Sequence, residues 1–241
     1  MPQASHMAAK EAIEQNGFAV IEKVYTDTAL HTIIAAIEQV SGSAKATFRK
    51  GSALFAIRQF LKEVPEAVPA LFSTKLTAII HDIFGKDFFV VKSIYFDKPP
   101  QSNWFVPYHQ DLTISVRAKA PVPGYGPWTV KQNQYAVQPP PEILQNNFTI
   151  RIHLDDTDEK NGALRVIPGS HVNGICRPEA VDLLQQKEVS AIVPKGGIML
   201  MRPLLFHASG RTTNNKRRRV IHMEFSNSQL PPPLQWSEVV R

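Results

Sequence analysis

A histidine and an aspartate lie two positions apart in the segment 104–116, which reads WFVPYHQDLTISV. Side chains alternate between the two faces of a β-strand, so we expect His109 and Asp111 to share one face and Gln110 to point away. An imidazole and a carboxylate placed in this way, joined by a second histidine from a distant strand, form the two-histidine, one-carboxylate set of non-haem Fe(II) oxygenases. The triplet therefore indicates a candidate metal site.

The spacing alone is not specific, because the chain holds 8 histidines and repeats the pattern elsewhere. His153 and Asp155 have the same spacing, but Asp155 opens an acidic turn, where a solvated carboxylate is the usual state. His222 and Glu224 form a related pair, for which we expect an exposed or core-edge role instead of metal binding. The first triplet therefore needs support from the rest of the chain.

Length and composition are those of one soluble globular domain. The chain has 241 residues, of which 43% are hydrophobic and 20% charged, and we expect a single domain over 1–241. Cys176 is the only cysteine, which excludes an intrachain disulfide and a cysteine-based zinc site and fits a reducing compartment. No apolar run approaches the ~20 residues of a membrane span, and the N-terminus has no signal-peptide pattern. We expect a cytoplasmic protein without a membrane partner.

The net charge of +6 permits anionic ligands but does not demand nucleic acid. Basic residues are scattered except for the run 216–219 (KRRR), and no aromatic-rich basic stripe accompanies that run. We therefore expect no nucleic-acid partner. Residues 1–7 contain Ser5-His6-Met7, which looks like a cloning remnant, so this segment is interpreted as a tag or disordered.

Helical patterns come first and short strands follow. Helical spacing covers 8–15, 27–40, 52–61 and 73–84, with a brief helix near 178–186; strand patterns cover 18–21, 88–96, 109–116, 148–154, 163–167, 189–193, 198–201 and 218–225. This order predicts a mainly β fold with α-helices: a double-stranded β-helix (jelly-roll) core flanked by an N-terminal helical layer.

The region 117–147 is rich in proline and glycine and includes three consecutive prolines at 139–141. Long segments of this kind are often lids or binding loops, and the aromatic residues within it argue against plain disorder. We interpret it as an active-site lid. Arg117 and Trp128, with Tyr108 beside the metal triplet, are candidates for substrate contact, which would suit a medium-sized substrate with an anionic or planar part.

Four blocks in the right order resemble the phytanoyl-CoA dioxygenase family, over roughly residues 15–226. They are FDKPP at 96–100, YHQDL at 108–112, NGALRVIPGSH at 161–171, and HASG at 207–210 followed by Arg218. The family consists of oxygenases that use Fe(II), 2-oxoglutarate as cosubstrate and O2. The resemblance implies that His109, Asp111 and His207 hold the iron.

The resemblance also assigns the cosubstrate site. It implies that Arg218, eleven residues after His207, binds the far carboxylate of 2-oxoglutarate, and that Ser209 supplies an assisting hydroxyl. A guanidinium fork matches a carboxylate through two parallel hydrogen bonds. Arg217 and Arg219 should lie on the opposite strand face, so the choice of Arg218 depends on the register.

Arg151 is the clearest departure from the family pattern, which has an aromatic residue at this position. An arginine that points into a barrel needs an anionic partner to offset its desolvation. Arg151 is therefore expected to contact a substrate or cosubstrate carboxylate, the alternative being a structural pair with a neighbouring acid. Thr149, on the same strand face, is a candidate hydroxyl donor to 2-oxoglutarate.

The activity implied is hydroxylation of a small-molecule substrate with release of succinate and CO2. Related halogenases lack the carboxylate that Asp111 provides, which favours a hydroxylase, while desaturation, epimerisation and cyclisation by the same chemistry stay open. Substrate identity and oligomeric state, monomer or homodimer, are not determined by the sequence. The alternative class is a non-enzymatic jelly-roll (cupin-like) metal- or small-molecule-binding or sensor domain, which would have no need for Arg218 and Ser209.

Overall fold

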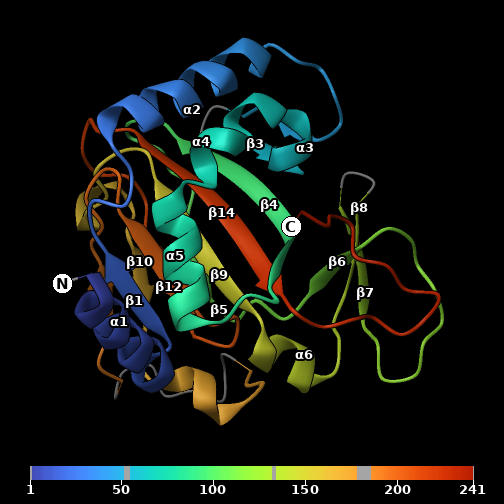
Figure 1. Ribbon diagram of the computed structural model, residues 1–241. Coiled ribbons are helices and arrows are strands. Elements are labelled where there is room, and N and C mark those ends of the chain that lie inside the picture. The colour runs from blue at the N-terminus through green and yellow to red at the C-terminus, as the bar shows by residue number, and fades with distance from the viewer. Residues whose placement is uncertain (1, 52–54, 132–133, 178–185, 241) are drawn as a thin grey trace.

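The computed structural model describes residues 2–51, 55–131, 134–177 and 186–240 (Figure 1). The helices are α1 (Pro2–Asn16), α2 (Asp27–Val40), α3 (Phe60–Glu63), α4 (Val68–Leu71), α5 (Thr74–Ile83) and α6 (Pro141–Asn146), with short 3-10 helices at Pro65–Ala67, Glu159–Asn161 and Ser170–Asn173. The strands are β1 (Phe18–Ile21), β2 (Phe48–Arg49), β3 (Phe55–Arg58), β4 (Phe89–Lys98), β5 (Val106–His109), β6 (Ile114–Val116), β7 (Trp128–Lys131), β8 (Gln134–Val137), β9 (Phe148–His153), β10 (Leu164–Val166), β11 (Val189–Ala191), β12 (Ile198–Met201), β13 (His207–Ser209) and β14 (Arg218–Ser226).

Two antiparallel sheets form the centre of the molecule. The larger has the order β1-β12-β9-β14-β4-β3-β2, and the smaller has the order β11-β10-β13-β5. Residues of β4, β9 and β14 from the first and of β5, β10 and β13 from the second line one cavity, so the two sheets face each other across it. This arrangement confirms the predicted jelly-roll core.

The N-terminal helices cover the outer face of the larger sheet, where α4 and α5 lie in front of its strands and α2 runs along the top of the view (Figure 1). Strand β9 shows how one segment serves both faces. Ile150 and Ile152 join the hydrophobic core that includes the helices, while Thr149 and Arg151 alternate with them and point inward, where Arg151 lines the cavity. Burying both faces explains why almost the whole strand is hidden from solvent.

Helices α2 and α5 begin where the sequence predicts. The Thr26 side chain accepts a hydrogen bond from the Ala29 N–H at 3.2 Å and starts α2. The Ser73 side chain accepts from the Leu76 N–H at 3.2 Å and starts α5. Both caps satisfy backbone donors that the first helical turn leaves free.

The helical prediction for 52–61 is wrong over its middle. Residues 55–58 form strand β3, which pairs with β4 so that Ile57 lies opposite Tyr95. Ala56 and Ile57 are buried there. Pairing with a long neighbouring strand outweighs a local helical pattern, because tertiary contacts override weak propensity. The brief helix predicted near 178–186 falls almost entirely outside the described residues.

The strand expected to run through the metal triplet ends at its histidine. Strand β5 stops at His109, and β6 begins only at Ile114, where it joins a different sheet with β8 and β7. Asp111 therefore lies in the link between two strands, and period-two alternation is not what aligns it with His109. Its backbone N–H donates to the Pro203 carbonyl at 2.8 Å, which fixes the link.

Helix α1 begins at Pro2, earlier than predicted. Residues 2–7, which the sequence analysis interprets as part of a tag or disordered segment, are therefore helical. Within it, His6 Nδ1 lies 2.7 Å from Asp82 Oδ2 of α5.

The region predicted to be a lid forms part of a small sheet of its own. Strands β7 and β8 pair with each other and with β6, beside the two central sheets in Figure 1. Val137, Leu144 and Trp236 belong to the hydrophobic cluster of this subregion. Among the described residues of 117–147, none lines the cavity between the central sheets.

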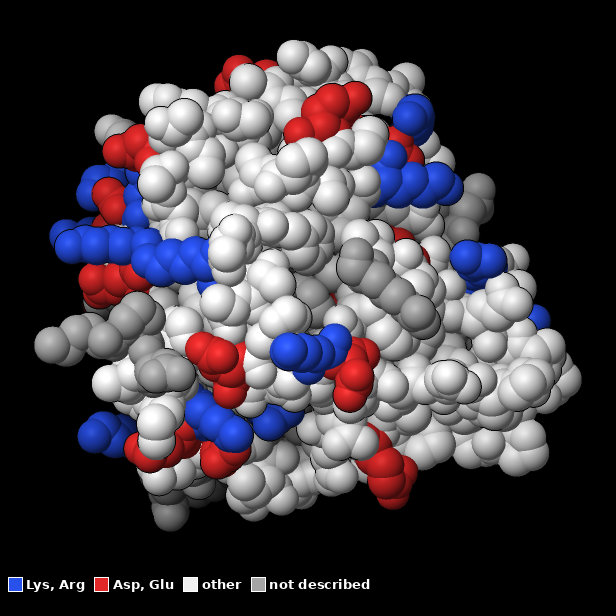
Figure 2. Space-filling view, in the orientation of Figure 1, with Lys and Arg blue, Asp and Glu red and all other residues white. Residues whose placement is uncertain are grey.

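Charged side chains of both signs are interspersed on the face shown in Figure 2, so the positive net charge is not gathered into one basic patch there. Among the helices of the described residues, none has the length and apolarity that crossing a membrane requires.

Candidate metal centre

The two histidines of the predicted triad meet because their strands pair. His109 ends β5 and His207 begins β13, and the antiparallel register places them directly opposite each other. Their ring centroids are 4.2 Å apart. A residue from the first half of the chain and one from near its end are thus neighbours on one wall of the cavity.

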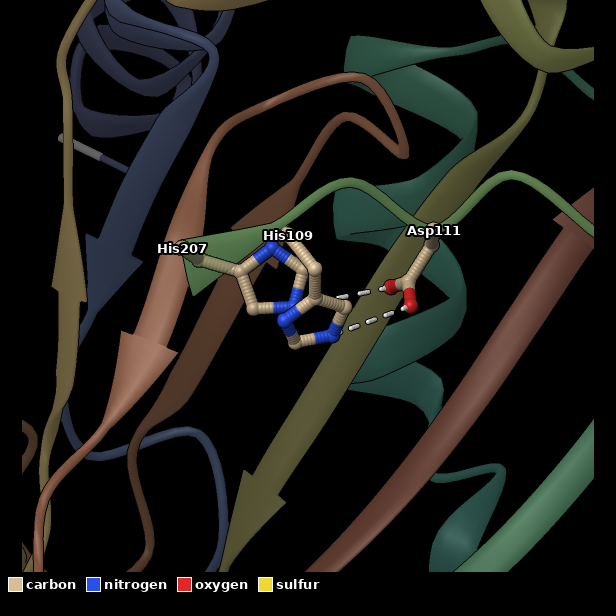
Figure 3. A group of neighbouring side chains, drawn as sticks. All are labelled: His109, Asp111 and His207. Atoms are coloured by element: carbon tan, nitrogen blue, oxygen red, sulfur yellow. Dashed lines mark ion pairs between the residues drawn. The ribbon is translucent and has the colours of Figure 1, made fainter. Parts of the chain in front are cut away.

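Asp111 completes the triad from the link after β5. His109 Nε2 lies 3.9 Å from Asp111 Oδ1, and His207 Nε2 lies 3.9 Å from Asp111 Oδ2, as the dashed lines of Figure 3 mark. These distances are too long for hydrogen bonds. One ligand atom from each residue lies within 4.8 Å of the others, so a single ion can reach all three. The predicted triad is therefore assembled in space.

The hydrogen bonds of the rings select the nitrogen that faces a metal. His109 Nδ1 lies 2.9 Å from the Pro107 carbonyl, and His207 Nδ1 lies 2.9 Å from the Leu205 carbonyl. A carbonyl only accepts, so each Nδ1 carries the proton and each Nε2 keeps its lone pair. Asp111 Oδ2 is buried without a hydrogen-bond partner. Two lone pairs and an unsatisfied carboxylate oxygen around one space are the donor set of a divalent metal site.

The surrounding charges keep these groups in the states that bind metal. Burial alone would raise the pKa of the Asp111 carboxyl, but His207, His222 and Lys92 outweigh it and lower that pKa to about 2. Burial lowers the pKa of the His207 imidazole to about 4. At neutral pH the carboxylate is ionised and this imidazole is neutral, which is what coordination of a cation requires.

Gln110, between the first two ligands, holds the segment in place from the other side. Its Nε2 donates to the carbonyls of Leu204 at 2.7 Å and Gly174 at 2.8 Å, and its Oε1 accepts from the Cys176 N–H at 2.9 Å. Ser170 acts in a similar way on the other strand, because its Oγ accepts from the backbone N–H of Phe206, next to His207. Sequence reasoning missed both anchors.

The facing wall carries the predicted cosubstrate arginine. Arg218 is buried on β14 and lines the same cavity of about 130 Å³. Its Nη1 donates to the Gly162 carbonyl, and its Nε is buried without a partner. Burial lowers the pKa of this guanidinium to about 9, with a further contribution from Arg151, so it stays charged at neutral pH. A buried cation with an unused donor favours an anionic ligand.

Of the three consecutive arginines 217–219, only Arg218 points to the inner face. Arg217 and Arg219 pair with Asp97 and Asp155, and neither lines the cavity. Ser209 does line it, and its Oγ donates to the same Gly162 carbonyl at 3.2 Å.

Gly162 belongs to the family block at 161–171 and cannot carry a side chain here. Its φ is +87°, and a Cβ atom would lie 2.7 Å from Lys98 Nζ and 2.9 Å from the Gly210 carbonyl oxygen. Lys98, a fully buried residue, lies directly opposite Arg218 in the β4–β14 ladder and donates to the Gly210 carbonyl. Burial, with a further contribution from Arg218, lowers the pKa of Lys98 to about 7. The sequence analysis did not identify this second cation.

The remaining predicted residues divide into two groups. Arg151 is buried in the cavity wall beside the triad, and Thr149 is fully buried on the same strand with no partner for its Oγ1. Tyr108, Arg117 and Trp128 do not line the cavity: the Tyr108 hydroxyl donates to Glu188, Arg117 Nη1 donates to Gln235 at 3.1 Å, and Trp128 packs in the cluster of the small sheet. Of the predicted residues in these two groups, only Arg151 lines the cavity.

His222 and Glu224 are also in this wall, not at the surface or at a core edge as the sequence indicated. Both are buried, and His222 lines the cavity. Their ligand atoms and that of Asp111 lie within 4.8 Å of one another. His153, of the other repeated pattern, is buried too, and its Nδ1 lies 2.7 Å from the Thr157 hydroxyl.

Several solved structures are similar to this chain in fold at low sequence identity. AviO1 from Streptomyces viridochromogenes Tue57 is 21% identical with a TM-score of 0.67, over 94% of this chain and 97% of that one. The non-haem α-ketoglutarate-dependent carbocyclase SnoK of nogalamycin biosynthesis is 16% identical with a TM-score of 0.68, over 91% and 83%. EctD from S. alaskensis, solved with 2-oxoglutarate and 5-hydroxyectoine, is 15% identical with a TM-score of 0.69, over 90% and 74%. These similarities support the jelly-roll fold.

No curated protein matches the chain significantly in sequence. The family model of phytanoyl-CoA dioxygenase (PhyH) matches residues 13–220, which include the triad, Arg151 and Arg218. With most of its length covered, the chain belongs to the phytanoyl-CoA dioxygenase family.

Proposed function

We propose that this protein is an Fe(II)- and 2-oxoglutarate-dependent dioxygenase that hydroxylates a small-molecule substrate with release of succinate and CO2. The observation that carries the proposal is the placement of unused groups on facing walls. His109 Nε2, His207 Nε2 and Asp111 Oδ2 surround one space, and the unpartnered Nε of the Arg218 guanidinium lies across the cavity from it. A metal ion would bind the three ligand atoms, and a dicarboxylate bound to that ion would give the Arg218 guanidinium its partner.

The roles of the residues follow from their chemistry. His109, Asp111 and His207 would hold the iron on one side and leave the rest of its coordination sphere open. Arg218 would bind the far carboxylate of 2-oxoglutarate, releasing its Nη1 from the Gly162 carbonyl or sharing it. Iron and cosubstrate, when bound with O2, supply an oxidant for an unactivated C–H bond.

The chain itself orients the reactants and limits water. Gln110 fixes the metal-binding link, Ser209 donates to the Gly162 carbonyl beside Arg218, and Lys98 donates to the Gly210 carbonyl. The cavity also has apolar lining from Ile94, Phe96 and Trp104. Such a lining restricts water and accommodates the carbon skeleton of a substrate.

The position of Thr149 in the sheet does not support the predicted contact with 2-oxoglutarate. Its neighbours in the ladder are Glu224 and Met201, which places it beyond Arg151 along β9 from the end that holds Arg218. Its hydroxyl is buried without a partner, but Thr149 is not among the residues that line the cavity.

The test is to assay succinate formation from 2-oxoglutarate with Fe(II) and O2, and to measure 2-oxoglutarate binding to the Mn(II)-loaded protein without turnover. We expect metal-dependent binding and slow succinate release even without substrate, both lost in His207→Ala. A protein that binds the metal but neither binds nor consumes 2-oxoglutarate would instead be a metal-binding jelly-roll domain without this activity. Product analysis with an accepted substrate then separates hydroxylation from epimerisation or cyclisation.

A further inference from the structure

Arg151 is a buried arginine with no acid as its partner in the described structure. It is 7% exposed and lines the cavity beside the triad. Its Nη1 lies 3.1 Å from His222 Nδ1, and its Nε is buried without a hydrogen-bond partner. A guanidinium buried in this way is costly unless an anion offsets its desolvation.

The partner of Arg151 is a neutral ring, as the hydrogen bonds require. A guanidinium only donates, so His222 Nδ1 accepts and the ring proton is on Nε2. That nitrogen lies 3.1 Å from Glu224 Oε1 and donates to it. Glu224 Oε1 also accepts from Lys92 Nζ at 2.6 Å. We call the series Lys92, Glu224, His222 and Arg151 the buried relay.

The buried relay fixes Arg151 without neutralising it. Lys92 neutralises the negative charge of Glu224. His222, which is uncharged, positions the Arg151 guanidinium through its hydrogen bond. Burial lowers the pKa of Arg151 to about 10, so it remains a cation at neutral pH. One positive charge is therefore left facing the cavity.

Metal and cosubstrate would not remove this charge. A divalent ion is matched by Asp111 and by the carboxylate of 2-oxoglutarate that binds it, and the other carboxylate is matched by Arg218. Lys98 can lose its proton near neutral pH, since its pKa is lowered to about 7, chiefly by burial. After these pairings the guanidinium of Arg151 is the one lining charge without a counterion among the described residues.

Position along the sheet also separates Arg151 from the cosubstrate anchor. Arg151 lies opposite His222 in the β9–β14 ladder, and His222 is four residues beyond Arg218 on β14. At ~3.3 Å per residue this is about 13 Å along the strand. The two arginines therefore occupy different positions along the inner face, although their charges still interact, because Arg151 contributes to lowering the pKa of Arg218.

A second metal ion held by Asp111, His222 and Glu224 is a poorer explanation of this cluster. Both ring nitrogens of His222 are already engaged, with Arg151 and Glu224. Lys92 and Arg151 place two cations around the same groups. A further cation would face repulsion from both, whereas an anion would be attracted.

We infer that Arg151, held by the buried relay, binds an anionic group of the primary substrate, so that the enzyme acts on small organic acids. The planar fork of the guanidinium matches a carboxylate, and Val106, Leu164 and Ile94 provide apolar lining for the rest of such a molecule. This inference rests on the proposed function and adds the substrate class to it.

The experiment uses matched acids and amides as probes of the Mn(II)-loaded protein saturated with 2-oxoglutarate. Binding of acetate and benzoate is compared with that of acetamide and benzamide by calorimetry, in wild type, Arg151→Gln and Arg151→Lys. We expect wild type to bind at least one acid roughly 10-fold or more tightly than its amide. The preference should vanish in Arg151→Gln and be partly retained in Arg151→Lys, which keeps the charge without the fork.

Arg165→Gln is the matched control. Arg165 follows the cavity-lining Leu164 on β10 but does not line the cavity itself, and its Nη1 pairs with Glu188 at 3.3 Å. The Arg165→Gln variant should therefore prefer acids over amides to the same degree as wild type. Mn(II) affinity, measured in every variant, shows that the site is folded.

Different results would contradict the role of Arg151 and the proposed dioxygenase function. Wild type that binds acids and amides equally, or binds neither, contradicts the inference. A loss of 2-oxoglutarate affinity above about 10-fold in Arg151→Gln, with the acid preference intact, would assign Arg151 to the cosubstrate and overturn it too. Failure of wild type to bind 2-oxoglutarate at all would instead reject the proposed function.

Discussion

Two groups of polar side chains in the cavity walls, the metal triad and the series Lys92, Glu224 and His222, differ in how far their hydrogen bonds are satisfied. On the wall of β5 and β13, the triad leaves two imidazole nitrogens and a carboxylate oxygen without partners. On the wall of β4, β9 and β14, Lys92, Glu224 and His222 are bonded to one another in series. Buried polar groups without hydrogen-bond partners indicate a ligand site, whereas buried polar groups bonded to one another indicate a structural role. The difference predicts that changes on the first wall affect binding and changes within the series affect stability.

The largest effect is expected from His207→Ala. Losing one of three ligands should weaken Mn(II) or Fe(II) binding by more than ~100-fold, beyond the range typical of outer-shell residues, and abolish 2-oxoglutarate turnover. Metal titration by calorimetry measures the change. His171→Ala is the control, because His171 contacts the Glu14 carbonyl and lies outside the triad. Equal metal affinity in wild type and His207→Ala would show that the first wall is not a metal site.

Arg218→Gln should come next, with metal binding kept and 2-oxoglutarate binding weakened. The loss of a charge-assisted hydrogen-bonding pair corresponds to roughly 10–100-fold in affinity. Titration of the Mn(II)-loaded protein with 2-oxoglutarate gives the value. Arg217→Gln removes the neighbouring arginine that pairs with Asp97 on the other face, and its cosubstrate affinity should match wild type. If the two variants behave alike, the assigned register at the cosubstrate site is wrong.

Lys92→Met tests the supporting role of the second wall. It leaves Glu224 buried with only His222 as its partner, and breaking a buried pair in this way costs about 3–5 kcal/mol. Thermal unfolding should therefore shift downward, by roughly 2–4 °C per kcal/mol for a chain of this size. The double variant Lys92→Met/Glu224→Gln should recover much of the loss, because it removes the uncompensated charge. Full wild-type stability in the single variant would contradict a structural role for the ion pair.

The smallest effect concerns Lys98 and pH. Its folded-state pKa of about 7 lies below the ordinary lysine value, so the unfolded chain binds more protons between about pH 7 and pH 10. The free energy of unfolding should therefore rise with pH across this interval, relative to Lys98→Met, in which the contribution is absent. Urea unfolding of both proteins at several pH values measures the difference. Parallel curves would mean that the Lys98 ammonium is not desolvated.

The triad on the first wall and Arg218 on the second were accessible from the sequence, and most of the supporting contacts on the second wall were not. His109, Asp111, His207 and Arg218 follow from blocks whose order resembles a known family. Strand alternation does not account for the position of Asp111, because β5 ends at His109 and the Asp111 N–H is held by the Pro203 carbonyl.

The contacts that the sequence did not predict depend on the register between strands. Lys98 meets Arg218, and Arg151 meets His222, through antiparallel ladders between segments far apart in the chain. No local pattern carries that information. The helical reading of 52–61 failed for a related reason, since its middle pairs with β4, and a short apolar run fits a helix as well as a strand.

The most direct test of the account is a crystal structure with Mn(II) and 2-oxoglutarate, in which anomalous scattering locates the ion. The account predicts one anomalous peak bounded by His109 Nε2, an Asp111 carboxylate oxygen and His207 Nε2, with the far carboxylate of 2-oxoglutarate on the Arg218 guanidinium. A peak between Asp111, His222 and Glu224, or a cosubstrate that does not reach Arg218, would contradict it.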